Sequence, residues 1–182
     1  MIQEKLDVWT NEVLRYNHRL HLVSSSMEKD FREHVEDCLY LLEHIQEPYI
    51  TDLGSGSGLP AIPYKLIHPD SYIYMLERSA KKCTFLRHIV ELLGLISIEA
   101  IQADALSDDI GRFDAIITRS FSPKNTLEKA VSKILSDEGR LYYMHTGDTL
   151  PALSDIFTLQ GRISKRCTMH TLHLSTYIIN PL

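Results

Sequence analysis

The fold of this chain is decided by one stretch, Asp52-Leu53-Gly54-Ser55-Gly56-Ser57-Gly58-Leu59-Pro60-Ala61-Ile62-Pro63. The run at 49–53 leads into it and predicts a short strand, and residues 61–67 predict a helix. Glycines between a strand and a helix let the backbone turn sharply and approach a bound molecule closely. The stretch therefore predicts a strand–loop–helix unit that holds a nucleotide-like ligand.

Strand and helix patterns continue to alternate on the C-terminal side of this stretch. Apolar runs predict strands at 72–76, 98–101, 113–118 and 139–144, with helices at 79–93 and 125–135. A short helix near 152–157 and a hairpin of 163–168 and 172–179 should follow. This order predicts an α/β fold with a Rossmann-like, mainly parallel sheet and helices on both faces.

The N-terminal side has a helical period instead. Apolar residues recur every three to four positions over 6–20 and again over 31–45, with a turn at Ser24–Ser26 and a stop at Pro48. We expect a single domain, in which residues 1–46 form a helical cap and residues 47–182 form the Rossmann-like core.

The composition limits the function. The chain has 182 residues and a net charge of −5, which disfavours nucleic-acid binding through global charge but leaves room for a local basic patch. The three cysteines form no CxxC pair, and no apolar run approaches the roughly 20 residues of a membrane span. The N-terminus does not have the pattern of a signal peptide. We expect a soluble, cytoplasmic monomer without a metal site.

The glycine spacing narrows the choice of ligand. A phosphate-binding P-loop needs a Lys-Ser/Thr pair that is absent, and the third glycine of a dinucleotide motif would fall on Leu59. Asp52, directly before the loop, would repel a diphosphate and favour a cationic ligand with an amino group. S-adenosylmethionine is such a ligand. Glu77, at the end of the next predicted strand, would accept its ribose hydroxyls, and Asp104, after the third strand, would reach the adenine edge.

Each acidic residue also has a structural alternative. An Asp or Glu at the end of a strand is often solvated or caps a helix, and for Asp104 the two interpretations stay equally open. The candidate cofactor-binding residues are therefore a set whose members support one another: Asp52, Gly54, Gly56, Gly58, Leu59, Glu77, Asp104 and Ala105.

Further motifs carry a family resemblance. They are the two prolines behind the glycine loop, Tyr16-Asn17, His34-Val-Glu-Asp37, Lys81-Lys82-x-x-Phe85-Leu86, and Phe113-Asp114 leading to Arg119-Ser-Phe121. With these motifs the chain, from about Trp9 to Gly147, resembles the GidB/RsmG family. The resemblance implies methylation of guanine N7 in bacterial 16S ribosomal RNA with S-adenosylmethionine. It also implies a class I methyltransferase fold with seven strands, the last antiparallel, and an N-terminal helical cap.

The resemblance places the cofactor at the glycine loop and at Glu77, and the partner would be ribosomal RNA or the small ribosomal subunit. It makes Arg119 the candidate catalytic residue and puts Lys82 and His34 more loosely on the substrate side. Guanine N7 carries a free lone pair, so the reaction mainly needs alignment of reactants rather than a base. Arg119 would hold the guanine edge or a phosphate. Phe121 would either stack on the base or pack in the core.

The chain departs from the family pattern at several positions. His21-Leu22-Val23-Ser24 replaces Asn-Leu-Thr-Ser, and Ala61 replaces a glycine. Asp104, Thr146 and Leu172 stand where the family has cations that would face RNA. Two alternatives therefore remain: a divergent, non-catalytic cofactor- or RNA-binding homologue, and a methyltransferase with a different substrate.

The histidines and the cationic residues have further candidate roles. His170 and His173 would point to opposite faces of a strand, and His34 would pack the helical hairpin, which disfavours a metal site. Cations gather in three sequence clusters that allow a modest RNA-binding patch: Lys81, Lys82, Arg87 and His88; Lys124, Lys129 and Lys133; Arg162, Lys165 and Arg166.

Overall fold

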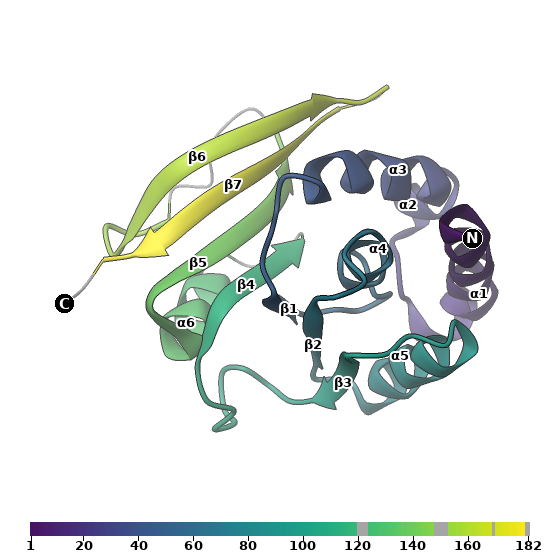
Figure 1. The fold of residues 1–182 in the computed structure, drawn as a ribbon, viewed down its shortest axis with the longest axis horizontal. Coiled ribbons are helices and arrows are strands. Elements are labelled where there is room, and N and C mark those ends of the chain that lie inside the picture. The colour runs from purple at the N-terminus through teal and green to yellow at the C-terminus, as the bar shows by residue number, and fades with distance from the viewer. Residues whose placement is uncertain (120–123, 148–152, 169, 181–182) are drawn as a thin grey trace.

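One sheet organises the molecule. The computed structural model describes residues 1–119, 124–147, 153–168 and 170–180, and within them seven strands pair in the order β3-β2-β1-β4-β5-β7-β6 (Figure 1). The strands are β1 (Tyr49–Leu53), β2 (Tyr72–Glu77), β3 (Ile98–Gln102), β4 (Phe113–Arg119), β5 (Leu135–Thr146), β6 (Phe157–Arg166) and β7 (Thr171–Ile179). The pairs among β1 to β5 are parallel, and β7 is antiparallel to both β5 and β6. This confirms the predicted fold class.

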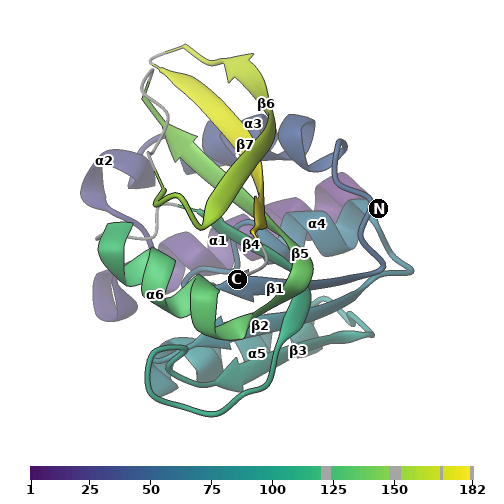
Figure 2. The ribbon, with the colours of Figure 1, turned by 90° about the vertical axis from the view of Figure 1, so that its left-hand side faces the viewer.

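Helices cover both faces of the sheet (Figures 1 and 2). They are α1 (Ile2–Leu20), α2 (Ser25–Glu28), α3 (Phe31–Leu42), α4 (Ala61–Ile67), α5 (Ala80–Leu92) and α6 (Lys124–Ile134). The first face carries α1, α3, α4 and α5, and the other carries α6. None of the described helices has the length and apolar character needed to cross a bilayer.

Each face has its own buried cluster. On the first, Trp9, Phe31 and Leu86 from three helices pack against sheet residues such as Met75. On the second, α6 packs Leu127, Val131 and Ile134 onto strands that include Ile116 and Leu141. The alternation of side chains along each strand supplies both clusters from the same sheet.

Some predicted boundaries were wrong. Residues 153–156 form no helix, and Phe157 already begins β6, because Phe157 pairs with Ile179 across the hairpin. Residue 152 lies outside the described residues. The tertiary pairing with β7 thus overrides the local helical pattern. The expected turn at Ser24–Ser26 includes the start of α2, since the Ser24 side chain accepts a hydrogen bond from Met27 N–H.

Candidate active site

The glycine loop connects β1 to α4 and meets the end of β2. Gly54 N–H donates to the Leu76 carbonyl at 2.9 Å, which ties the loop to the neighbouring strand. Gly58 has a φ of +93°, and a Cβ there would lie 2.7 Å from Ile62 Cγ1. Position 58 therefore requires glycine both for its backbone conformation and for its close approach to α4.

Glu77 ends β2 with its carboxylate under the loop. The residue is 7% exposed, its Oε2 accepts from Gly56 N–H at 3.0 Å, and its Oε1 accepts from Ser79 N–H at 2.8 Å. A carboxylate has about four acceptor sites, so two remain after these bonds. Glu77 thus fixes the loop and still presents acceptors to the adjacent cleft.

That cleft opens at the carboxyl ends of the parallel strands. It encloses about 420 Å³, within the range of small-molecule sites. It is lined by several predicted residues: Gly54, Glu77, Asp104, Ala105 and Arg119. Lys82, placed loosely on the substrate side, also lines it. The lining also includes residues that no sequence pattern indicated: Leu53, Leu76, Arg78, Ala103, Leu106, Thr126 and Ala130. The apolar members gave no signal because their spacing is that of ordinary core residues.

Four predicted residues lie outside the cleft lining. Asp52 is 1% exposed and lies beneath the loop, and Leu59 is buried in the first cluster. Gly56 and Gly58 shape the loop through their backbone. These four residues support the site from behind rather than lining it.

Asp104 has a structural bond as well as a place in the cleft. Its Oδ1 accepts from Leu106 N–H at 2.9 Å, and its own N–H donates to Asp108 Oδ2 at 2.9 Å. The residue therefore organises the turn after β3, whereas the structural alternatives expected for it were a solvated carboxylate or a helix cap. Ala105, at the same turn, is 6% exposed and contributes an apolar surface to the cleft.

A second cavity adjoins the first. It encloses about 430 Å³ between α2, α3 and the ends of β4 to β7, and its lining includes His34, Asp37, Thr146, His170 and Arg119. Arg119 lines both cavities, and its buried Nη1 has no hydrogen-bond partner among the described residues. An unpaired buried guanidinium nitrogen is costly, so it marks a place where a ligand acceptor would be favourable.

The second cavity has mixed charge. Burial alone would raise the pKa of Asp37, but the hydrogen bond with Cys167 and the ion pair with Lys165, whose Nζ lies 3.1 Å from Oδ1, hold that pKa below its usual value. Burial lowers the pKa of His34, and the nearby charges of Arg119 and His170 lower it further. The cavity therefore combines a charged carboxylate and guanidinium with a His34 that favours its neutral form.

His34 was expected either on the substrate side or packed in the helical hairpin. It lines the second cavity and stacks on His170, with ring centroids 5.3 Å apart, instead of simply packing the helical hairpin. Ligand atoms of His34, Asp37 and His170 lie within 4.8 Å of one another. Arg119 and Lys165 both act on this group and disfavour a further cation there. The expectation of no metal site stays a prediction.

The N-terminal helices hold the glycine loop in place. Trp9 is fully buried in α1, and its indole Nε1 donates to the Ser57 carbonyl at 2.9 Å. Asn17 Oδ1 accepts from Val23 N–H at 2.9 Å, which shapes the chain where it leaves α1. Lys82 Nζ donates to the His21 carbonyl at 2.9 Å. The helical cap is thus bonded to the site, which no sequence spacing indicated.

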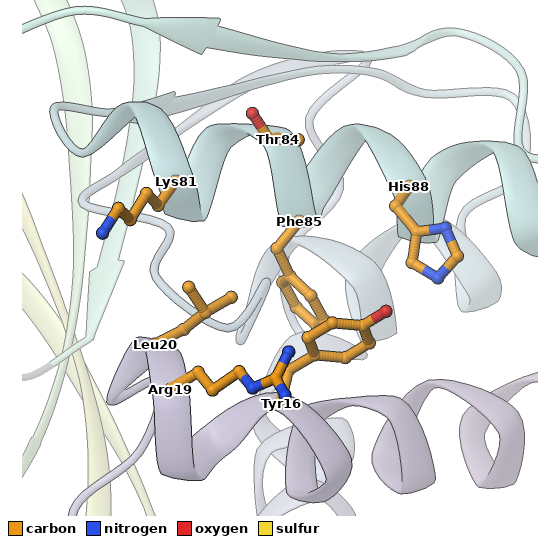
Figure 3. Close-up of a pocket in the computed structure, with 7 residues that line it drawn as sticks. All are labelled: Tyr16, Arg19, Leu20, Lys81, Thr84, Phe85 and His88. Carbon is orange, nitrogen blue, oxygen red and sulfur yellow. The ribbon is translucent and has the colours of Figure 1, made fainter.

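A groove runs between α1 and α5 beside the first cavity (Figure 3). Its floor holds Tyr16 and Phe85, with ring centroids 5.7 Å apart, and Arg19 and Lys81 reach over it from the two helices. His88 closes the far end. Of the first predicted cation cluster, Lys81 and His88 line the groove, with His88 paired to Glu12 at 3.1 Å, whereas Arg87 lines a different pocket. The basic patch stays a prediction.

The residues that replace the family cations have different environments. Thr146 is exposed at the second cavity, whereas Leu172 is 1% exposed in β7 between β5 and β6. The expectation that position 172 faces RNA was wrong, because the side chain points into the first buried cluster.

Phe121, proposed for stacking, lies outside the described residues, and so does the side chain of Lys124 in the second cation cluster.

We expect Leu172→Arg to lower the free energy of unfolding by at least about 3 kcal/mol, because it buries an unpaired charge. Thr146→Lys, at an exposed position, should change it by less than about 0.5 kcal/mol. Urea unfolding of both variants measures this difference. Similar stabilities for the two variants would contradict the burial of position 172.

Asp52 should make stability depend on pH. Burial raises its pKa to about 7, helped by the charge of Glu77 and opposed by hydrogen bonds from Ser55 and Ala61. The folded state then binds a proton more tightly than the unfolded chain, so stability falls as pH rises from about 4 to about 7 and levels off above. Asp52→Asn should remove this decline, which would be worth roughly 4 kcal/mol at 1.36 kcal/mol per pH unit.

The measurement is the free energy of unfolding of the wild type and of Asp52→Asn at several pH values between 4 and 8. Asn resembles the protonated carboxyl in shape, so the variant should match the wild type at pH 4 and exceed it at pH 8. A difference that stays constant across this range would contradict the raised pKa.

Comparisons with known proteins agree with this geometry. Residues 2–166 match the model of the GidB family, described as rRNA small subunit methyltransferase G. Two proteins named ribosomal RNA small subunit methyltransferase G are similar to this chain. The protein of Brachyspira hyodysenteriae is 34% identical, and the alignment covers 76% of this chain and 69% of that protein. The protein of a Geobacter strain is 29% identical, and the alignment covers 78% of this chain and 67% of that protein. The solved ribosomal protein L11 methylase of Lactobacillus delbrueckii is 18% identical, with a TM-score of 0.60 over 81% of this chain and 79% of its own.

Proposed function

Because the chain belongs to the GidB family of small-subunit ribosomal RNA methyltransferases, we propose that it transfers the methyl group of S-adenosylmethionine to N7 of a guanine in bacterial 16S ribosomal RNA. One observation carries the proposal. Arg119 stands between two adjoining cavities, one suited to the cofactor and one open to a substrate.

The chemistry of the first cavity supports S-adenosylmethionine. The Glu77 carboxylate offers acceptors for both ribose hydroxyls, and Ala105 with Leu106 offers an apolar surface for the adenine. The Gly54 backbone lies at the turn where the amino-acid end of the cofactor would approach closely. Asp104 would contribute through the backbone of its turn, since Oδ1 is already bonded to Leu106 N–H.

The reaction then needs alignment more than acid–base chemistry. The lone pair of guanine N7 forms the bond to the methyl carbon, the carbon–sulfur bond breaks, and its electron pair stays on sulfur. The positive charge passes from the sulfonium to the guanine ring, and no proton moves in this step. Alignment of two bound reactants can contribute up to about 7–11 kcal/mol. Arg119 would donate to guanine O6, next to the reacting nitrogen.

The groove between α1 and α5 supports RNA as the partner. The half-buried ring of Tyr16 can accept a stacked base, whereas Phe85 is only 4% exposed and packs against it, and cations beside the groove pair with phosphates. Lys81 and Arg19 supply such cations next to the first cavity, although the chain as a whole carries −5. RNA binding would therefore rest on this local surface and show a salt dependence that reflects few phosphate contacts.

Lys81→Glu should weaken binding to small-subunit RNA by about tenfold at low salt and reduce the salt slope by about one unit. Affinity for S-adenosylhomocysteine should not change, because Lys81 does not line the first cavity. The matched control is Lys129→Glu, the same charge reversal at an exposed position on α6, across the sheet from the groove. Equal losses in the two variants would mean that the groove is not the main RNA-binding surface, and that global charge or the predicted cluster on α6 contributes as much.

The proposed activity is tested with labelled S-adenosylmethionine and small-subunit RNA, free or in subunits, from cells that lack the modification. We expect label in 7-methylguanosine after digestion of the RNA. Calorimetry with S-adenosylhomocysteine establishes that the cofactor site is intact. A protein that binds this product yet transfers no label to RNA would overturn the proposal, and label in another molecule class would favour a different substrate.

A further inference from the structure

Asp37 brings a buried carboxylate to the wall of the second cavity. The residue is 6% exposed on α3, and its Oδ1 is paired with Lys165 of β6. A carboxylate has about four acceptor sites, so this ion pair and the contact with Cys167 leave capacity for further donors. The cavity can therefore accept hydrogen bonds from a planar ligand that offers adjacent N–H groups.

Asp37 and Arg119 differ in which of the two cavities they line. Arg119 lines both cavities, whereas Asp37 lines only the second among the cavities described here. A base in the second cavity would therefore place one edge near Arg119 and the cofactor and another edge near Asp37. Guanine fits this arrangement, because N7 and O6 are acceptors on one edge, while N1–H and N2–H₂ are donors on the neighbouring Watson–Crick edge.

We propose that the second cavity receives the target guanine and that Asp37 determines its specificity by accepting hydrogen bonds from N1–H and N2–H₂. The inference rests on the proposed function, since it names how that site would recognise its base. Adenine offers an unprotonated N1 at the equivalent position, which would face the carboxylate without a hydrogen. Asp37 thus discriminates between the purines.

The same carboxylate favours the reaction. As N7 takes the methyl group, positive charge develops on the guanine ring, and its N1–H and N2–H₂ become stronger donors. The hydrogen bonds to Asp37 are therefore stronger in the transition state than in the bound substrate, which is the condition for lowering the barrier. Lys165 keeps Asp37 in place, so it is a positioning residue.

The test compares guanosine and inosine monophosphate, which differ by the N2 amino group, in NMR titrations of the full chain saturated with S-adenosylhomocysteine. The wild type should bind guanosine monophosphate about tenfold more tightly, the value of one charge-assisted hydrogen bond. Asp37→Asn should reduce this ratio to below about twofold. Equal binding of the two nucleotides by the wild type would overturn the inference without any variant.

Two variants separate recognition from structure. Glu36→Gln, the same carboxylate-to-amide change at an exposed position on α3, should keep the wild-type ratio. Lys165→Met removes the ion pair that holds Asp37, so its preference for guanosine monophosphate should fall between that of the wild type and that of Asp37→Asn. If Asp37→Asn keeps the wild-type ratio, the inference fails.

The two proposals fail separately. A wild type that methylates small-subunit RNA but binds both nucleotides equally would retain the proposed function and lose the role of Asp37. A wild type that prefers guanosine monophosphate but methylates no RNA would retain the role of Asp37 as a guanine reader and lose the proposed function.

Discussion

Glu77→Ala is expected to weaken S-adenosylhomocysteine binding by at least about 100-fold. Two charge-assisted hydrogen bonds to the ribose, at about 1.5–3 kcal/mol each, would be lost together. The variant would also leave Gly56 N–H and Ser79 N–H without their acceptor and so loosen the glycine loop. Calorimetry measures the affinity, and methyl transfer should fall with it at subsaturating cofactor.

The matched control for this variant is Glu99→Ala. Glu99 is an exposed carboxylate on β3, the strand next to β2, and does not line the cleft. Its removal should leave the affinity within about twofold of the wild type. Melting curves of both variants show whether the fold persists. A folded Glu77→Ala protein with near wild-type affinity would contradict the assignment of the ribose to Glu77.

Trp9→Ala should lower the free energy of unfolding by about 3–5 kcal/mol, the usual cost of removing a buried tryptophan. The indole packs edge-on against Phe31, with ring centroids 5.5 Å apart, and bonds to the Ser57 carbonyl. The variant leaves both a cavity and an unpaired carbonyl. Because Ser57 belongs to the glycine loop, cofactor affinity should also fall. Urea unfolding and calorimetry measure the two effects.

Trp9→Phe separates packing from the hydrogen bond. It fills most of the space, so its loss of stability should be about 1–3 kcal/mol. Trp9 is also the single tryptophan of the chain, so its fluorescence reports on the helical cap while circular dichroism reports on the whole fold. We propose that cap and core form one domain, which predicts coincident transitions for both signals. Separate transitions would contradict a single domain.

Several features were predictable because they depend on neighbouring residues. The glycine loop, the strand before it and the helix after it follow from backbone freedom and from periodicity, and their bounds agree with β1 and α4. The helix predicted at 79–93 begins as expected, with the Ser79 side chain accepting a hydrogen bond from Lys82 N–H. Glu77 was predicted as a candidate cofactor-binding residue because it lies at the end of the second strand.

The remaining features of the site depend on contacts between residues that are far apart in the sequence. Trp9 meets Ser57, Asp37 pairs with Lys165, and Arg119 joins two cavities, because the sheet order brings together segments that are far apart in the chain. The β6 boundary and the burial of Leu172 were decided in the same way, by pairing across the hairpin.

There is a physical reason why the sequence predicts some of these features and only the tertiary structure decides the others. Hydrophobic period, glycine conformation and strand-end position are local properties, so the amino-acid sequence alone determined the α/β class, the loop and the acid at the end of β2. Which side chains face one another is set by packing of whole elements, whose free energy is shared among many contacts. The tertiary structure therefore decided where the second cavity lies, that Asp37 reaches it, and that position 172 is core rather than surface.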